Sequence, residues 1–257
     1  MKRFAPLIAI AFVSLIAPAF GEMNIDVVVD GLNNPWEMVF APNGDIYFSE
    51  RDGRVWKIEN FGEAKVIQTF PKSGSYEGGT LGLALHPNFE ENKKIYIYQT
   101  NLELEFFQNK VFSFTVDGDE LVDVQTVIDD IPGAPWHDGG RIAFGPDDKL
   151  YITTGDAVNP GWSQDLSSLA GKILRINSDG SIPDDNPFDS SAIFSYGHRN
   201  PQGIAWNDEG MLVSSEHGPS GEMGYGHDEI NVIVKGENYG WPKVVGDSSD
   251  DRYVNPV

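Results

Sequence analysis

One histidine of this chain stands where an imidazole could act as a base. His137 lies in the segment 136–141, which contains two adjacent glycines and runs directly into the apolar residues 142–144. Only five histidines occur in the 257 residues, and imidazole is the side chain best able to accept a proton near neutral pH. We therefore predict that His137 is a catalytic base. A turn histidine bonded to the backbone remains the alternative on this segment alone.

A second polar segment could bind an anionic or quinone ligand. Arg199, Asn200 and Gln202 lie in residues 196–203, just ahead of another apolar strand pattern, as His137 does. Arginine presents a planar, permanently charged fork to carboxylate or quinone oxygens, and the two amides can donate hydrogen bonds. We predict that these three residues bind a ligand. An arginine paired with an acid of the core is the structural alternative.

A third group of segments carries oxygen ligands of the kind that calcium binds. Residues 215–219, 228–231 and 238–242 supply carboxylates and amides, and the pair Gly218 and Pro219 offers backbone carbonyls without competing side-chain bulk. The spacing is not that of an EF-hand loop, so the pattern alone is a weak signal of calcium.

These segments belong to a repeat in which an apolar strand enters a turn and leaves as a second alternating strand. The turns of the four copies contain Pro42, Pro87, Pro146 and Asn207, and later strands are visible at 54–58, 110–114, 172–176 and 229–233. The intervals suit four-stranded blades, so we predict an all-β propeller. A β-sandwich would not repeat one turn signature at such intervals. The glycine-rich stretch 77–82 lacks the lysine and following helix of a phosphate loop, and we interpret it as a turn facing the channel.

The first 21 residues differ from the rest. Lys2 and Arg3 precede an apolar stretch without acids that ends in small residues, which is typical of a cleaved secretory signal. We predict a signal peptide at 1–21 and a partial propeller domain at 22–257, because no strand pattern near Val257 would close a ring. The protein is then secreted, periplasmic or held at the cell surface, without stable membrane insertion. An uncleaved N-terminal anchor is the alternative.

Composition limits the choice of partners. The chain has no cysteine, so the fold depends on burial, hydrogen bonds and bound metal rather than on disulfides. Its formal net charge of −21 would repel nucleic acids and anionic lipids, and we predict that it binds no nucleic acid. An acidic surface that keeps an exported protein soluble explains most of this charge.

Several motifs in the same order resemble those of the glucose/sorbosone dehydrogenase family. They are residues 137–141, 174–187, 197–203, 228–231 and 238–242. The soluble members of that family are PQQ-dependent glucose and aldose sugar dehydrogenases with six four-stranded blades. The resemblance therefore implies a six-bladed β-propeller of antiparallel blades that is C-terminally incomplete in this chain.

The resemblance also implies an activity. The full protein would oxidise the anomeric carbon of aldose sugars to lactones with PQQ and Ca²⁺, and pass the electrons to an external acceptor. His137 would be the base, and Arg199 and Asn200 would contact the quinone. The carbonyls of Gly218 and Pro219 would bind the calcium that polarises PQQ. A second, structural calcium would be held by the residue pair Glu229 and Tyr239.

Two departures from the family keep a second class of function open. Glu77 stands among the cofactor-binding positions where the quinoproteins usually carry glutamine. The family's remaining cationic PQQ contacts would lie beyond Val257. A non-catalytic, calcium-stabilised extracellular propeller that binds a glycan or a protein is the alternative, and a hydrolase or lactonase with a calcium in the channel is a weaker third hypothesis.

Overall fold

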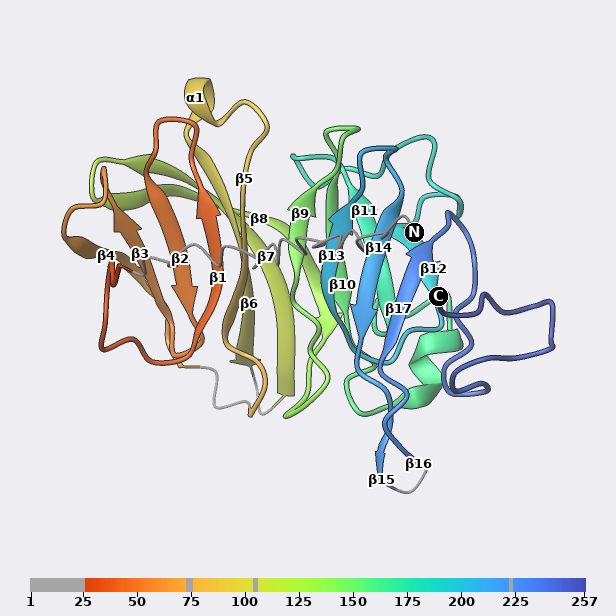
Figure 1. The fold of residues 1–257 in the computed structure, drawn as a ribbon. Coiled ribbons are helices and arrows are strands. Elements are labelled where there is room, and N and C mark those ends of the chain that lie inside the picture. The colour runs from red at the N-terminus through yellow and green to blue at the C-terminus, as the bar shows by residue number, and fades with distance from the viewer. Residues whose placement is uncertain (1–25, 73–75, 104–105, 222–223) are drawn as a thin grey trace, which may run out of the picture.

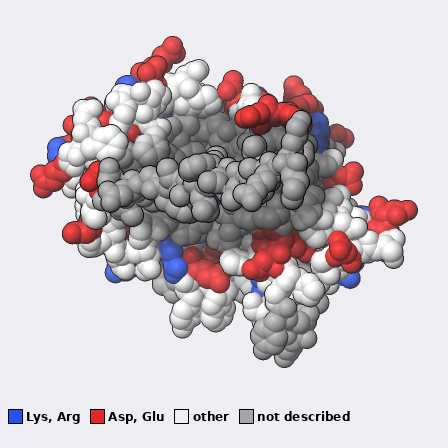
Figure 2. Space-filling model, viewed as in Figure 1, with Lys and Arg blue, Asp and Glu red and all other residues white. Residues whose placement is uncertain are grey.

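The fold is built from four antiparallel sheets that stand side by side (Figure 1). The computed structural model describes residues 26–72, 76–103, 106–221 and 224–257, so the predicted signal peptide at 1–21 lies outside the described residues. Within those ranges no helix is both long enough and apolar enough to cross a membrane. On the face shown in Figure 2, acidic side chains outnumber basic ones, in keeping with the net charge of −21.

The strands follow one another along the chain as four blades. The first blade comprises β1 (Pro35–Phe40), β2 (Ile46–Glu50), β3 (Arg54–Ile58) and β4 (Ala64–Thr69). The second comprises β5 (Thr80–Leu85), β6 (Lys94–Glu103), β7 (Phe106–Asp117) and β8 (Glu120–Pro132). The third comprises β9 (Ile142–Phe144), β10 (Leu150–Thr154), β11 (Lys172–Ile176) and β12 (Ile193–Tyr196). The fourth comprises β13 (Pro201–Trp206), β14 (Leu212–Glu216) and β17 (Glu229–Ile233).

Three short elements connect the strands. The helix α1 (Phe89–Asn92) joins β5 to β6, and the 3₁₀ helix η1 (Pro160–Gln164) lies between β10 and β11. A two-stranded ribbon of β15 (Ser220–Gly221) and β16 (Gly224–Tyr225) projects from the fourth blade, between β14 and β17.

This arrangement confirms the predicted propeller architecture. The first strands of successive blades contact one another, β1 with β5, β5 with β9 and β9 with β13, as expected for the inner strands of a propeller. The four predicted repeats coincide with the first two strands of the four blades, and the later predicted strands with β3, β7, β11 and β17. The described residues thus form four blades, not the six that the resemblance implies for a full-length protein. Residues 234–257 follow the fourth blade, and within them Asn238 forms an isolated bridge with Tyr196.

Apolar side chains fill the spaces between neighbouring blades. Every residue of β10 and of β11 is buried, because both faces of the third blade are covered by other blades. The largest core cluster joins the second and third blades through Leu81, Tyr96, Tyr98, Ile142, Leu150 and Leu174.

One charged side chain is buried in the third blade. Lys172, at the start of β11, has no exposed surface. Its Nζ donates hydrogen bonds to the carbonyl oxygens of Trp162 at 2.7 Å, Ser163 at 3.2 Å and Ala170 at 2.6 Å. Burial lowers the pKa of Lys172 to about 7. The three bonds fasten η1 and the loop that follows it to the sheet.

Replacing this lysine tests how much its three hydrogen bonds contribute to the free energy of unfolding. In Lys172→Met three buried carbonyl groups lose their donor, so we expect the free energy of unfolding to fall by about 2–4 kcal/mol. Because the pKa of Lys172 is lowered in the fold, the unfolded chain binds more protons between pH 7 and 10.5, the ordinary pKa of a lysine. This group therefore makes wild-type stability rise with pH over that window. Urea unfolding at pH 7 and pH 9 measures both effects.

The exposed Lys65, paired with Asp119 at 2.5 Å, provides the matched control. Lys65→Met should change the free energy of unfolding by less than about 1 kcal/mol, since exposed ion pairs contribute little. Equal urea midpoints for the two variants would contradict the structural role of Lys172.

Candidate functional site

The loops that lead into the inner strands of three blades meet at one place. Glu77 precedes β5, His137 precedes β9, and Asn200 precedes β13. One carboxylate oxygen of Glu77, Oε2, accepts the backbone N–H of His137 at 2.9 Å and Nδ2 of Asn200 at 3.4 Å. The structure therefore brings together residues that the sequence predicted separately as base and cofactor contacts.

The two predicted amides complete this cluster. Oδ1 of Asn200 accepts the backbone N–H of Gly139 at 3.0 Å and Nε2 of Gln202 at 3.2 Å. Gln202 also donates to the carbonyl of Gly139 at 3.3 Å. A cavity of about 170 Å³ opens here, and it is lined by Trp36, Arg51, Glu77, Asp138, Gly139, Gln202 and His217.

The predicted base is held by a buried carboxylate. Nδ1 of His137 lies 2.7 Å from Oδ1 of Asp156, whose side chain is only 1% exposed, whereas that of His137 is 17% exposed. Asp156 also accepts the backbone N–H of Val158 at 2.9 Å and Nε1 of Trp241 at 2.8 Å. Since an ionised carboxylate only accepts hydrogen bonds, Nδ1 of His137 carries the proton, and the lone pair lies on Nε2.

The backbone around this pair is held in an unusual conformation. His137, Ala157 and Val158 have φ values of +63°, +50° and +59°, which side chains other than glycine adopt at a cost of about 1–2 kcal/mol each. Between them, Gly155 approaches the backbone of His137 so closely that a Cβ there would lie 2.0 Å from its carbonyl oxygen. The position requires glycine, and the approach fixes the distance between the histidine and the carboxylate.

Asp156 and Trp241 were not predicted as parts of this site. Asp156 carries one usable signal in the sequence, because it comes two residues after the fully buried strand β10. Trp241 was assigned to the calcium-binding segments instead. Its partner Asp156 is 85 residues away in the chain, and no local pattern connects the two.

Arg199 lies beside the cluster but contacts other groups. Its Nη1 donates to the carbonyl of His217 at 3.2 Å, and the guanidinium stands 5.6 Å from the centre of the Trp241 ring. Burial lowers the pKa of Arg199, and the neighbouring carboxylates of Asp156 and Glu216 oppose that effect. The guanidinium is therefore buried near acidic side chains, while it contacts the carbonyl of His217 and the ring of Trp241.

The four residues predicted to bind two calcium ions line one small cavity. Gly218, Pro219, Glu229 and Tyr239 all face it, together with Glu216. The hydroxyl of Tyr239 donates to a backbone carbonyl at 2.7 Å and accepts a backbone N–H at 2.8 Å, so this phenol is already engaged. Burial raises the pKa of Glu229, and its two oxygens accept Gly246 N at 3.0 Å and Asn231 Nδ2 at 3.2 Å.

The described residues contain no cluster of three or more histidine, cysteine, aspartate or glutamate side chains around a metal position. Oδ1 of Asn231, whose amide nitrogen donates to Glu229, is one of the buried acceptors that lack a hydrogen-bond partner within the described residues. Asn231 was named in the sequence only as part of a calcium segment, and the structure gives its side-chain oxygen a specific place beside the carboxylate.

A buried histidine and carboxylate join this cavity to the site. Nδ1 of His198 lies 2.9 Å from Glu216 Oε2, its Nε2 lies 2.8 Å from Ser195 Oγ, and its ring stacks on Tyr239 with 4.6 Å between centroids. The other oxygen of Glu216 accepts the backbone N–H of Arg199. Glu216 thus positions the loop that carries the predicted ligand-binding residues.

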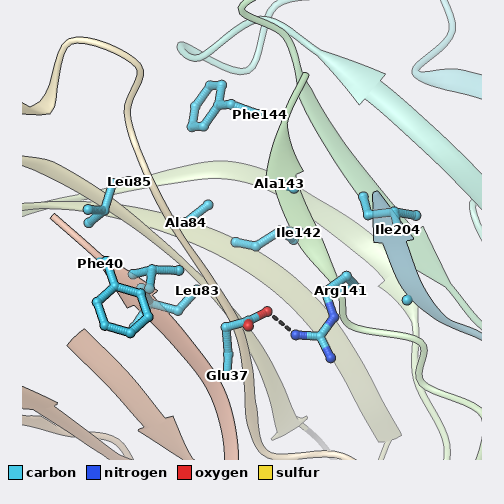
Figure 3. A pocket seen from close by; sticks show the side chains of 12 residues that line it. Glu37, Phe40, Leu83, Ala84, Leu85, Arg141, Ile142, Ala143, Phe144 and Ile204 are labelled. Carbon is cyan, nitrogen blue, oxygen red and sulfur yellow. Dashed lines mark hydrogen bonds and ion pairs between the residues drawn. The ribbon is translucent and has the colours of Figure 1, made fainter. Parts of the chain in front are cut away.

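A wider cavity follows the inner strands away from this cluster. It has a volume of about 570 Å³ and is lined by residues of β1, β5, β9 and β13 (Figure 3). Arg141 forms an ion pair with Glu37 across it, donates to the carbonyl of Gln202 at 3.1 Å and lies 4.0 Å from the ring centre of Trp36. Arg141 therefore lies between the polar cluster, to which Gln202 belongs, and this wider cavity.

Glu216 can be tested without any assumption about activity. In Glu216→Gln the new amide group must face either the N–H of Arg199 or Nδ1 of His198, so one buried hydrogen bond is lost. We expect the free energy of unfolding to fall by about 1–3 kcal/mol, measured by urea unfolding. Glu209→Gln, in an exposed turn, should change it by less than about 0.5 kcal/mol. Equal stabilities would show that Glu216 does not position the loop.

Comparison with known proteins gives consistent matches. The chain is 34% identical to quinoprotein glucose dehydrogenase B of Acinetobacter calcoaceticus, over 89% of this chain and 54% of that protein. It is 34% identical to an aldose sugar dehydrogenase of Escherichia coli, over 92% of this chain and 66% of that protein. The chain thus spans between about half and two thirds of the length of these relatives.

A solved structure agrees with these matches. The PQQ-bound aldose sugar dehydrogenase of Streptomyces coelicolor superposes with a TM-score of 0.82 at 38% identity, and the match covers 90% of this chain and 69% of that one. The family model described as glucose/sorbosone dehydrogenase matches residues 32–256, which include all four blades. The chain belongs to the glucose/sorbosone dehydrogenase family.

Proposed function

We propose that the full-length protein is a quinoprotein that oxidises the anomeric carbon of aldose sugars to lactones, with PQQ and calcium, and passes electrons to an external acceptor. The observation that carries the proposal is the pair of His137 and Asp156 at the mouth of the inner strands, which leaves Nε2 of the imidazole available as a base. Family membership and the names of the relatives supply the substrate class and the cofactor.

The residues around the site fit an anionic quinone. PQQ carries three carboxylates, which require cations or N–H donors when they leave water. Arg51 lines the cavity beside Gln202, and its buried Nε has no hydrogen-bond partner in the described ranges. Sequence reasoning did not select Arg51. The carboxylate of Glu77 accepts hydrogen bonds from two N–H groups, which offset part of its negative charge. It therefore repels a bound anion less than its position in the sequence suggested.

His137 and Asp156 would move the proton of the reaction. The anomeric hydroxyl gives its proton to Nε2 of His137 as the bond from C1 to oxygen becomes a double bond. Bound PQQ would supply the acceptor for the hydride that leaves C1. The buried carboxylate of Asp156 stabilises the imidazolium that forms, and it holds the ring in one tautomer throughout.

The oxygen donors near Glu229 fit calcium. Glu216 and Glu229 form a cross-strand pair, and Asn231, with its unpartnered Oδ1, lies two residues along β17 from Glu229. Calcium binds carboxylates, amide oxygens and backbone carbonyls, and Gly218 and Pro219 line this cavity. We propose that a calcium ion binds among these oxygens.

We also propose that the full-length protein has further blades and that it is exported. An apolar groove of about 440 Å³ lies on the first blade, where Met38 and Phe40 are 54% and 62% exposed. An exposed apolar face of this size suits the packing of another blade in a six-bladed ring. The proposal of export rests on the signal-like sequence at 1–21.

Two substitutions test the proposed proton transfer in the full-length protein reconstituted with PQQ and calcium. His137→Ala should lower kcat for dye reduction by aldoses about 10²- to 10⁴-fold, the usual contribution of a general base. Asp156→Asn should also lower kcat, because an amide group cannot accept from all three N–H donors around it. PQQ affinity, measured by titration, should change little in His137→Ala.

The binding-propeller hypothesis makes the opposite prediction. A wild-type protein that folds with calcium yet neither binds PQQ nor reduces the dye would overturn the proposed function. It would favour the alternative, a calcium-stabilised propeller that binds a glycan or a protein.

Calcium removal provides an independent test by thermal unfolding. Chelation should lower the Tm of the wild-type protein, because a ligand that binds only the folded state stabilises it. In Glu229→Gln this calcium-dependent difference in Tm should shrink, whereas Asp208→Asn in an exposed turn should leave it intact. A wild-type Tm that is the same with calcium and with chelator would refute calcium binding at this cavity.

A further inference from the structure

Two aromatic side chains are exposed beside the proposed catalytic base. Tyr76 and Trp136 are 68% and 45% exposed, and their rings stack in parallel, with 5.0 Å between centroids and 3° between planes. Each precedes a residue of the site directly, Tyr76 before Glu77 and Trp136 before His137. We call this pair the aromatic shelf.

The shelf is fixed by backbone hydrogen bonds. The N–H groups of Tyr76 and Glu77 both donate to the carbonyl of Pro135 at 3.1 Å. The guanidinium of Arg51 donates to the carbonyl of Tyr76. These bonds join the loops before β5 and β9 next to the two rings. The shelf is therefore organised before any ligand arrives, which lowers the entropic cost of binding.

Packing in the hydrophobic core does not account for these two rings, because both are exposed. Among the described residues, no other aromatic pair has two exposed rings, and pairs such as Tyr47 with Phe89 and Tyr151 with Phe194 include buried rings. Two large exposed rings at the rim of a polar site are typical of a ligand-binding surface. A flat apolar surface next to hydrogen-bonding groups suits a ligand with a C–H face and polar edges, and a pyranose ring has both.

The position of the shelf relative to His137 indicates which sugar it would hold. The ring undergoing oxidation must place its anomeric carbon at Nε2 of His137. In a pyranose, C4 lies across the ring from C1, so a 1→4-linked neighbour extends away from the base and toward the rim. The electropositive C–H groups of that neighbour can then pack on the negative face of an aromatic ring.

We propose that Tyr76 and Trp136 form a subsite for the second sugar of an oligosaccharide whose reducing end is oxidised at His137. This inference rests on the proposed function and adds a specificity determinant to it. The shelf would raise kcat/KM for 1→4-linked disaccharides relative to glucose, since binding energy from the remote ring helps to position the reacting one.

The test compares glucose with maltose and cellobiose in the full-length, PQQ-loaded and calcium-loaded protein. Trp136→Ala and Tyr76→Ala should each lower kcat/KM for a disaccharide about 3- to 10-fold, the usual contribution of one aromatic contact. The value for glucose should stay within about twofold. Trp136→Phe retains a ring and should recover most of the disaccharide activity.

A loss that is equal for glucose and the disaccharides would overturn the subsite, because the rings would then serve the reacting sugar or the fold. No loss for either sugar would overturn it as well. A change confined to the KM of the electron acceptor would assign the shelf to acceptor docking and would also overturn it.

A binding measurement separates this inference from the proposed function. Methyl maltoside has no free anomeric hydroxyl, so it can bind without being oxidised. Calorimetric titration should show saturable binding to the wild-type protein that is weakened at least about threefold in Trp136→Ala. Such binding by a protein that reduces no dye with glucose or maltose would support the shelf and refute the dehydrogenase. Absence of binding, with glucose oxidation intact, would do the reverse.

Discussion

The site depends on one buried carboxylate that accepts three N–H groups. Asp156 is shielded from water, so its charge is tolerable only because His137, Val158 and Trp241 all donate to it. The donors come from the loop before β9, from the loop after β10 and from the segment that follows the fourth blade. The carboxylate therefore connects the segment around Trp241 to the two loops that flank the paired strands β9 and β10, and it determines the orientation of the imidazole.

The carboxylate is in turn positioned by strained and buried backbone. Gly155 brings the loop after β10 against the carbonyl of His137, and the positive φ of His137 turns its side chain toward Asp156. Gly171 donates to the carbonyl of Gly155 at 2.7 Å, and the adjacent Lys172 is caged by three carbonyls. Neighbouring hydrogen bonds offset the conformational cost of the positive φ and the cost of burying the lysine. Strain at functional sites usually persists only when surrounding contacts hold it in this way.

The sequence predicted the blades well because strand alternation and turns are local properties. It also placed Glu77, His137 and Asn200 correctly on loops before inner strands, since blade register follows from the repeat. It missed Asp156 and Arg51, because their importance arises from contacts between blades. The four residues predicted to hold two calcium ions all line one small cavity together with Glu216, and the two-calcium expectation stays a prediction. The pairing of β14 with β17 sets Glu216 opposite Glu229, and the sequence pattern did not reveal that register.

The negative charges at the site are compensated locally, unlike the net charge of the whole chain. Glu77, Asp156 and Glu216 each accept at least two N–H donors, so these negative charges are compensated where they stand. The buried Nε of Arg51, by contrast, has no acceptor within the described residues. A net charge of −21 repels anions at long range, and salt screens that repulsion beyond about 8–10 Å. An anionic ligand must then be recognised by direct contact with donors such as Arg51. The geometry of the cavity, rather than long-range electrostatic attraction, sets the selectivity for that ligand.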